Sequence, residues 1–216
     1  MRATTTMALA AVLVLLGAAA SSAYTVVSSH PRLYVVPDDL PALRAKCDGP
    51  MAADFADIRS WADENMNRQF PLSGVEAYEN HLAAYSFVYL VTGDVSYAGR
   101  AKAIAQNAIG MDYRGQPPYT RGIALFFDWC YDYLTSAERQ TFGWELGESG
   151  LAYAAGHNWV EMNNYHSKVS RLKELAYAGL PLFGEGIHET AATTLCDLFR
   201  EHTFGSQYVI ACVDEI

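Results

Sequence analysis

The chain has 216 residues, 51% of them hydrophobic and 18% charged. This length and composition are typical of one globular domain with a sizeable core, and they exclude a disordered or low-complexity chain. The net charge of −9 argues against nucleic acid or an anionic membrane as a partner. An anionic substrate would therefore have to be held by local Arg, Lys and His side chains.

The first residues are expected to form a signal peptide, residues 1–23. Arg2 precedes an apolar run, residues 7–16, that is too short to anchor the chain in a bilayer. Small residues then provide a cleavage site after Ala23. We expect a secreted or periplasmic mature chain, residues 24–216, without a membrane span.

The mature chain is expected to begin with an extended lead-in, residues 28–35, because Pro31 disfavours helix at the residue before it. A short helix follows and is broken at Gly49-Pro50. Apolar residues between 51 and 66 then recur at mostly helical spacing and predict a second helix.

Helix hairpins are expected over the rest of the chain. Apolar helices over residues 82–90 and 97–108 are separated by a turn in which Gly93 fits a C-cap and Asp94 an N-cap. Four more helical segments follow, one opened by a capping box at residues 135–138; they cover residues 122–134, 135 onward, 164–183 and 188–204. The one possible strand is 208–213. The pattern predicts an all-α fold of antiparallel helix hairpins, as in a toroid or solenoid of helices.

The stretch Asn163-Asn164-Tyr165-His166-Ser167 opens one of these helices and is the main candidate site. A helix start needs only one capping side chain, whereas this one has two amides and an imidazole. Asn163 or Asn164 could donate a hydrogen bond to a substrate oxygen while His166 transfers a proton. The alternative is an Asn N-cap beside a structural histidine.

Five segments in order resemble the N-terminal helical domain of the heparinase II/III-like polysaccharide lyases. They are residues 29–33 (SHPRL), 37–44 (PDDLPALR), 89–94 (YLVTGD) with Tyr97, 124–132 (ALFFDWCYD) and 163–167 (NNYHS). The resemblance covers nearly the whole mature chain, and it does not identify one substrate.

The resemblance implies an incomplete (α/α) toroid, normally followed by a β-sandwich domain. The family cleaves uronic-acid polysaccharides such as heparin, heparan sulfate and alginate by β-elimination. By resemblance, Asn164 neutralises the uronate carboxylate, Asn163 is its neighbour or cap, and His166 assists or acts as the base. In several members the Asn and His are adjacent, whereas here Tyr165 separates them. The family's Tyr and a sandwich-domain His are expected beyond Ile216, so we expect this fragment to bind at best.

Further side chains are candidates for substrate contacts: Tyr165, Trp159, Arg121, Tyr119 and His81. Trp159 could stack on a sugar, and Arg121 could pair with a carboxylate or sulfate, although an exposed first-turn arginine is the alternative. Asp128 and Asp132 are interpreted as helix-surface or capping groups.

Two other functions stay open: a non-catalytic carbohydrate-binding toroid, and an inverting hydrolase of the α/α-barrel type, which would need two carboxylates across a cleft. No cofactor or metal site is expected, since no two cysteines have zinc-knuckle spacing. The four cysteines are as compatible with one disulfide as with buried thiols; they are Cys47, Cys130, Cys196 and Cys212.

Overall fold

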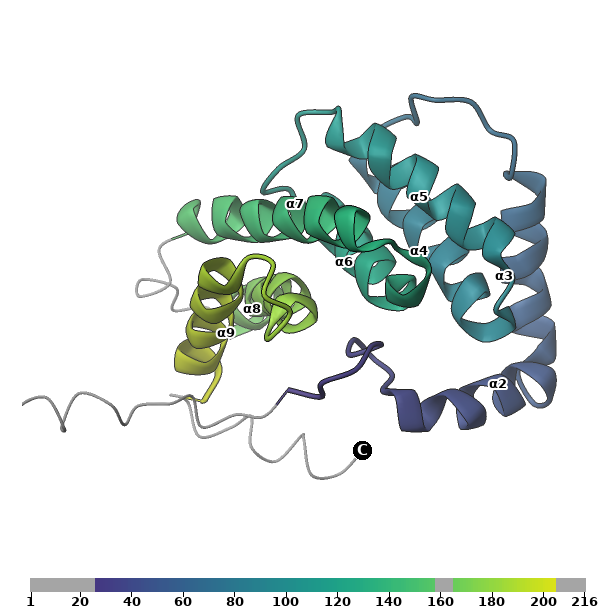
Figure 1. Ribbon diagram of the computed structural model, residues 1–216, viewed down its shortest axis with the longest axis horizontal. Helices are drawn as coiled ribbons and strands as arrows, with labels where there is room; N and C mark the ends of the chain where they lie inside the picture. Colours follow the sequence, from purple (N-terminus) through teal and green to yellow (C-terminus); the bar gives the residue numbers. More distant parts are fainter. Residues whose placement is uncertain (1–25, 158–164, 205–216) are drawn as a thin grey trace, which may run out of the picture.

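The computed structural model describes residues 26–157 and 165–204 (Figure 1). These residues form eight α-helices and three short 3₁₀ turns, and none of them lies in a strand. The all-α prediction is confirmed. The expected signal peptide and the possible strand at 208–213 lie outside the described residues. Within the described ranges, no helix combines the length and apolar character that crossing a bilayer requires.

The lead-in contains no helix, as predicted, but it is not extended throughout: it bends at residues 28–30 and 33–34, and Tyr34 has a positive φ. In Figure 1 it runs from below α9 toward α2. Three elements follow it: η1 (Pro37–Asp39), α2 (Leu40–Asp48) and α3 (Ala52–Glu64). Helix α2 ends where the sequence predicted, with Gly49 as its C-cap.

Three helix hairpins form the rest of the molecule. They are α4 (Val75–Thr92) with α5 (Val95–Ile109), α6 (Pro117–Trp129) with α7 (Ser136–Ala155), and α8 (Tyr165–Gly179) with α9 (Glu189–Phe204). Two 3₁₀ turns, η2 (Tyr131–Tyr133) and η3 (Leu180–Leu182), lie at the ends of α6 and α8. Helix α6 packs against α4 and also against α8, so the first members of the hairpins are neighbours.

The helix ends follow the local signals in the sequence. Gly93 has φ +73° and its amide donates to the Tyr89 carbonyl at 2.7 Å, while the Asp94 carboxylate accepts from the Ser96 amide at 2.9 Å. Thr135 and Glu138 form the expected reciprocal capping box. Helix α6 begins at Pro117, earlier than predicted, because a proline in the first turn gives up an N–H that would be unsatisfied there anyway.

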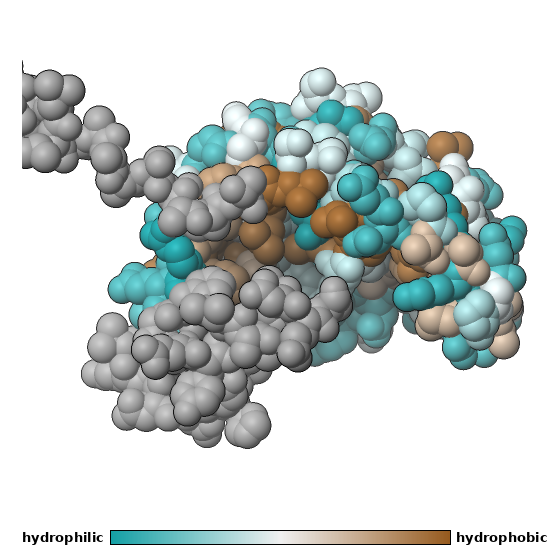
Figure 2. Space-filling view, turned by 90° about the horizontal axis from the view of Figure 1, so that it is seen from below, coloured by the Kyte–Doolittle hydropathy of each residue, from teal (hydrophilic) through white to brown (hydrophobic). Residues whose placement is uncertain are grey.

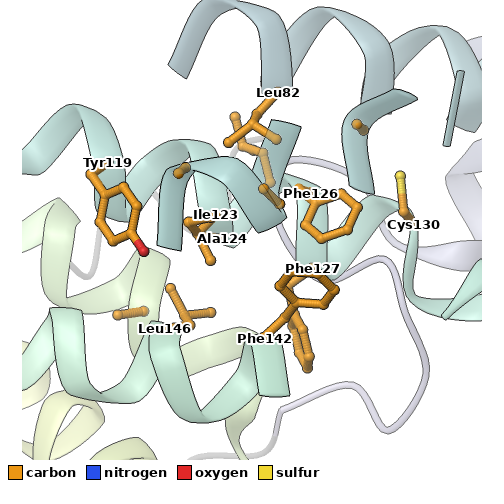
Figure 3. Close-up of a cluster of buried hydrophobic side chains, with 14 of the residues drawn as sticks. Leu82, Tyr119, Ile123, Ala124, Phe126, Phe127, Cys130, Phe142 and Leu146 are labelled. Atoms are coloured by element: carbon orange, nitrogen blue, oxygen red, sulfur yellow. The ribbon is translucent and has the colours of Figure 1, made fainter. Parts of the chain in front are cut away.

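The core runs through all three hairpins, with buried apolar side chains on every helix from α4 to α9. Phe126 and Phe142 meet edge to face, with ring centroids 4.9 Å apart, in the apolar cluster of Figure 3. Each fully buried side chain of this size contributes about 1.5–3 kcal/mol to folding. Most of the chain's aromatic residues are buried or partly buried in this core. On the face shown in Figure 2, hydrophobic residues gather near the middle and hydrophilic residues lie around them.

A stripe of glycines on α7 sets how closely the third hairpin approaches. A Cβ at Gly143, Gly147 or Gly150 would lie 2.9 Å or less from a side-chain atom of the third hairpin or its turn. At Gly150 the obstruction would come from Ala178 of α8 and Leu195 of α9, each at 2.6 Å. The missing side chains leave room for α8 and α9 to lie directly on the α7 backbone.

Cys47 and Cys130 are free thiols in the interior, and burial raises the pKa of Cys130 to about 12. Cys196 is buried as well, and Cys212 lies outside the described residues. Cys47 and Cys130 therefore behave as small apolar side chains.

Candidate functional site

The predicted catalytic stretch falls at the start of α8, whose first residue is Tyr165. Asn163, Asn164 and Trp159 lie outside the described residues, as do the side chains of Tyr165 and His166. Their roles stay predictions. What the structure adds is the framework around α8, which contains two ion-pair clusters and one hollow.

Arg121 lies at the centre of the first cluster, which we name the helix cluster. Its Nε and Nη2 donate to the two oxygens of Glu79 on α4 at 2.5 and 2.9 Å, and its Nη1 donates to Glu174 of α8 at 2.6 Å. Arg121 is neither exposed nor in the first turn of α6, so the alternative of an exposed first-turn arginine is wrong. Its guanidinium ties three helices together.

Glu174 is the unusual member of the helix cluster. Its side chain is 2% exposed, and its Oε2 has no hydrogen-bond partner among the described residues. Burial raises the pKa of Glu174, and the charge of Arg121 only partly opposes this. The cluster has two carboxyl groups for one guanidinium, so protonation of Glu174 would make its net charge zero.

Tyr119 and His81, two expected substrate contacts, are both buried. The Tyr119 hydroxyl donates to Glu145 at 2.8 Å, and burial followed by the charge of Glu145 raises the pKa of this phenol. His81 donates from Nδ1 to the Ala77 carbonyl at 2.7 Å, and its ring meets Trp61 edge-on at 4.7 Å. Burial lowers the pKa of His81. These contacts favour structural roles for both residues.

The second cluster holds the lead-in and was not foreseen; we name it the lead-in cluster. The Asp128 carboxylate accepts from the backbone amides of Arg32, at 2.9 Å, and Leu33, at 2.8 Å, and from His30 Nδ1 at 2.6 Å. Asp128 is 1% exposed. The interpretation of Asp128 as a helix-surface or capping group is therefore wrong, because the lead-in folds over the end of α6 and buries it.

Glu185, in the turn between α8 and α9, completes the lead-in cluster. It accepts from Arg32 at 2.5 Å, from His30 Nε2 at 3.2 Å and from the Tyr131 hydroxyl. Burial alone would raise the pKa of Glu185, but these hydrogen bonds and charges lower it to about 2. Burial acts to lower the pKa of His30, yet its two carboxylate partners outweigh burial and raise it. With His30 protonated, the cluster is a balanced set of two cations and two anions.

Arg32 also fixes the end of α8. Its Nη1 donates to three carbonyls in and after η3, those of Leu180, Pro181 and Phe183, at 2.9–3.3 Å. Pro181 has no N–H with which to continue the α8 ladder, and of the three carbonyls that of Leu180 also accepts from the Phe183 amide at 3.4 Å. The lead-in thus anchors the end of α8 that lies farthest from the predicted catalytic stretch.

A small hollow lies beside this anchor, between the lead-in and α8. It measures about 200 Å³ and is lined by Leu33, Tyr34, Lys173, Ala176 and Tyr177. Lys173 and Tyr177 are four residues apart and share a helix face. The helical spacing on α8 could have indicated this pair from the sequence, but nothing there indicates that Tyr34 faces it.

No group of three or more His, Cys, Asp and Glu side chains within the described ranges is arranged to hold a metal ion. A scan against models of known protein families finds no match for this chain, and a search of curated proteins also finds none.

Proposed function

We propose that this chain is the helical part of a secreted or periplasmic polysaccharide lyase. Its substrates would be uronic-acid polysaccharides of the heparin, heparan sulfate or alginate kind, cleaved by β-elimination. The three hairpins would form part of an incomplete (α/α) toroid. This proposal is supported by the ordered sequence segments and by the succession of helix hairpins, in which α4, α6 and α8 are neighbours.

The observation that carries the proposal is the beginning of α8 at Tyr165. In the sequence, Asn163 and Asn164 come immediately before this helix and His166 is its second residue. The N-terminus of a 15-residue helix has unpaired N–H groups and a partial positive charge, which favour a bound carboxylate. Amide donors at the same position would strengthen this preference.

The proposed chemistry needs those groups. The hydrogen at C5 of a uronate is weakly acidic while the adjacent carboxylate is charged. Donors from Asn164 and the helix N-terminus stabilise the negative charge that develops on the carboxylate as the proton leaves. His166 assists them or takes the C5 proton; the C4–C5 double bond forms as the C4–O bond breaks, and an acid protonates the departing oxygen. No water is consumed.

The remainder of α8 suits the same substrate. Positions 173 and 177 lie seven and eleven residues after position 166, and these spacings place all three on one face of a regular α-helix. At 1.5 Å per residue, positions 166 and 177 are about 16 Å apart along this face. An extended polysaccharide chain lying along α8 would pass from the predicted catalytic stretch toward Lys173 and Tyr177.

The test is the absorbance of unsaturated uronate products, measured on the full-length protein with several acidic polysaccharides. We expect Asn164→Ala and His166→Ala to lower turnover at least a hundredfold, because each removes a group that acts on the reacting uronate. The melting temperature should change little, as measured by circular dichroism. Asn67→Ala, at an exposed amide outside the helices, is the matched control and should retain activity.

Three outcomes would contradict the proposal. Absence of unsaturated product with every polysaccharide would exclude the lyase activity. New reducing ends without an unsaturated product would indicate a hydrolase. Retained activity with a large loss of stability in the His166 variant would show that this residue is structural.

A further inference from the structure

Tyr34 is held in a strained and exposed position. Its φ is +63°, in the left-handed region that bulky residues rarely adopt, and its side chain is 77% exposed. A residue needed only to complete this turn would be Gly or Asn. The tyrosine carries the backbone strain while most of its ring remains in solvent, so folding alone does not explain it.

The backbone around Tyr34 is nevertheless fixed. The two preceding amides, of Arg32 and Leu33, both donate to the buried Asp128 carboxylate. The Leu33 carbonyl accepts from Trp129 Nε1 at 3.1 Å. The tyrosine is therefore displayed on a rigid support, which lowers the entropy lost when a ligand binds to its ring.

The ring of Tyr34 is one wall of the hollow beside α8. The rings of Tyr34 and Tyr177 are 5.9 Å apart at 62°, and their hydroxyls are hydrogen-bonded to each other. Leu33 and Ala176 contribute apolar surface. The volume of about 200 Å³ lies below the roughly 300–1,000 Å³ of pockets for larger ligands, so the hollow suits one ring of a larger molecule.

Lys173 gives the hollow its charge. It is exposed, and its ammonium has no ion pair or hydrogen bond with any other residue of the described ranges. The adjacent Glu174 side chain is buried and directed to Arg121. A single cation beside two aromatic faces matches a six-membered sugar ring that has an apolar C–H face and one carboxylate.

We propose that the hollow lined by Tyr34, Lys173 and Tyr177 is a binding subsite for one uronate residue of an acidic polysaccharide, distinct from the predicted site of bond cleavage. Tyr34 stacks on the apolar face of the sugar ring, and Lys173 pairs with the carboxylate. The identity of the ligand rests on the proposed function. The subsite lies toward the C-terminal end of α8, so it holds the polysaccharide chain at a distance from the catalytic stretch.

The experiment measures binding of a defined oligouronate hexasaccharide to the full chain by isothermal titration calorimetry, with a neutral hexasaccharide of glucose as comparison. We expect Tyr34→Ala and Lys173→Gln each to weaken oligouronate binding at least tenfold. Tyr34→Phe keeps the ring and should bind within about threefold of the unchanged protein. Trp144→Ala and Lys46→Gln are the controls, since they remove an exposed aromatic and an exposed lysine outside the hollow.

Circular dichroism of each variant checks that it is folded. If Tyr34→Ala fails to fold, the single variant Lys173→Gln still tests the subsite, with Tyr34→Phe as its folded comparison. The proposal is overturned if the unchanged protein does not bind the oligouronate, if folded Tyr34→Ala and Lys173→Gln variants bind it as tightly as the unchanged protein, or if the neutral sugar binds equally well. If binding depends on Tyr34 but no unsaturated product forms, the proposed lyase activity is contradicted and the subsite is not. If unsaturated product forms but Tyr34→Ala and Lys173→Gln bind the oligouronate unchanged, the subsite is contradicted and the lyase activity is not.

Discussion

The lead-in cluster and the helix cluster both join distant segments through buried charges, but they differ in balance. The lead-in cluster pairs His30 and Arg32 with Asp128 and Glu185, so cations and anions are equal in number while His30 is protonated. The helix cluster sets one guanidinium against Glu79 and Glu174, and one oxygen of Glu174 is left without a partner among the described residues. In the lead-in cluster each carboxylate has a cation as partner, which suits an anchor, whereas in the helix cluster two carboxylates share one cation.

The largest effect is expected from removing the centre of the lead-in cluster. Asp128→Asn should lower the free energy of unfolding by about 3–5 kcal/mol, because it leaves buried cations and two backbone amides without their carboxylate. Urea unfolding followed by circular dichroism measures this loss. Asp132→Asn, at an exposed carboxylate four residues later, should change stability by less than about 0.5 kcal/mol. Equal losses in the two variants would show that the lead-in is not anchored at Asp128.

A smaller effect is expected in the helix cluster. Arg121→Met should lower the free energy of unfolding by about 1–3 kcal/mol near pH 8, since Glu174 loses its cation but can escape burial of a charge by taking up a proton. The exposed Arg68 provides the control variant, Arg68→Met. If Arg121→Met costs as much stability as Asp128→Asn, the unbalanced cluster is as rigid as the balanced one and the contrast between them fails.

The smallest effect is a difference in pH dependence. The pKa of Glu174 in the folded chain is raised above its ordinary 4.5, so the folded state binds the extra proton and stability is lost as pH rises from about 4.5. In the lead-in cluster, the raised pKa of His30 causes a loss only as pH rises above 6.5.

Unfolding profiles across pH 4–9 test this difference. Glu174→Gln should remove the stability loss from the lower window, and His30→Gln should remove the loss from the upper window. Identical profiles for Glu174→Gln and the unchanged chain above pH 4.5 would show that Glu174 stays ionised in the folded state.

The sequence predicted the elements of this fold well where the signals are local. The turn at Gly93-Asp94 and the capping box at Thr135 depend on residues within a few positions of one another, and both are confirmed. The apolar pattern predicts a helix only from residue 122, whereas α6 begins at Pro117, because proline is compatible with both a loop and the first turn of a helix.

The candidate site was less predictable because its parts come from distant segments. His30 and Asp128 are 98 positions apart, and Arg121 and Glu174 are 53 apart. No periodicity indicates such pairs, and an aspartate at the end of a helix has the same local pattern whether it faces solvent or a backbone segment folded over it. Tyr34 was missed for the same reason, since its strain and its contact with Tyr177 exist only in the folded chain.

The glycines of α7 have a consequence for how the protein folds. A glycine in a helix interior costs about 1 kcal/mol of helix stability relative to alanine, so Gly143, Gly147 and Gly150 make α7 a weak helix by itself. The side chains that fill their places belong to the third hairpin and its turn. We therefore expect α7 to gain much of its stability when α8 and α9 dock, and the three helices to unfold together as one cooperative unit. The stability of α8, the helix proposed to hold the polysaccharide, is then expected to depend on the small residues of α7, which lie outside the proposed subsite.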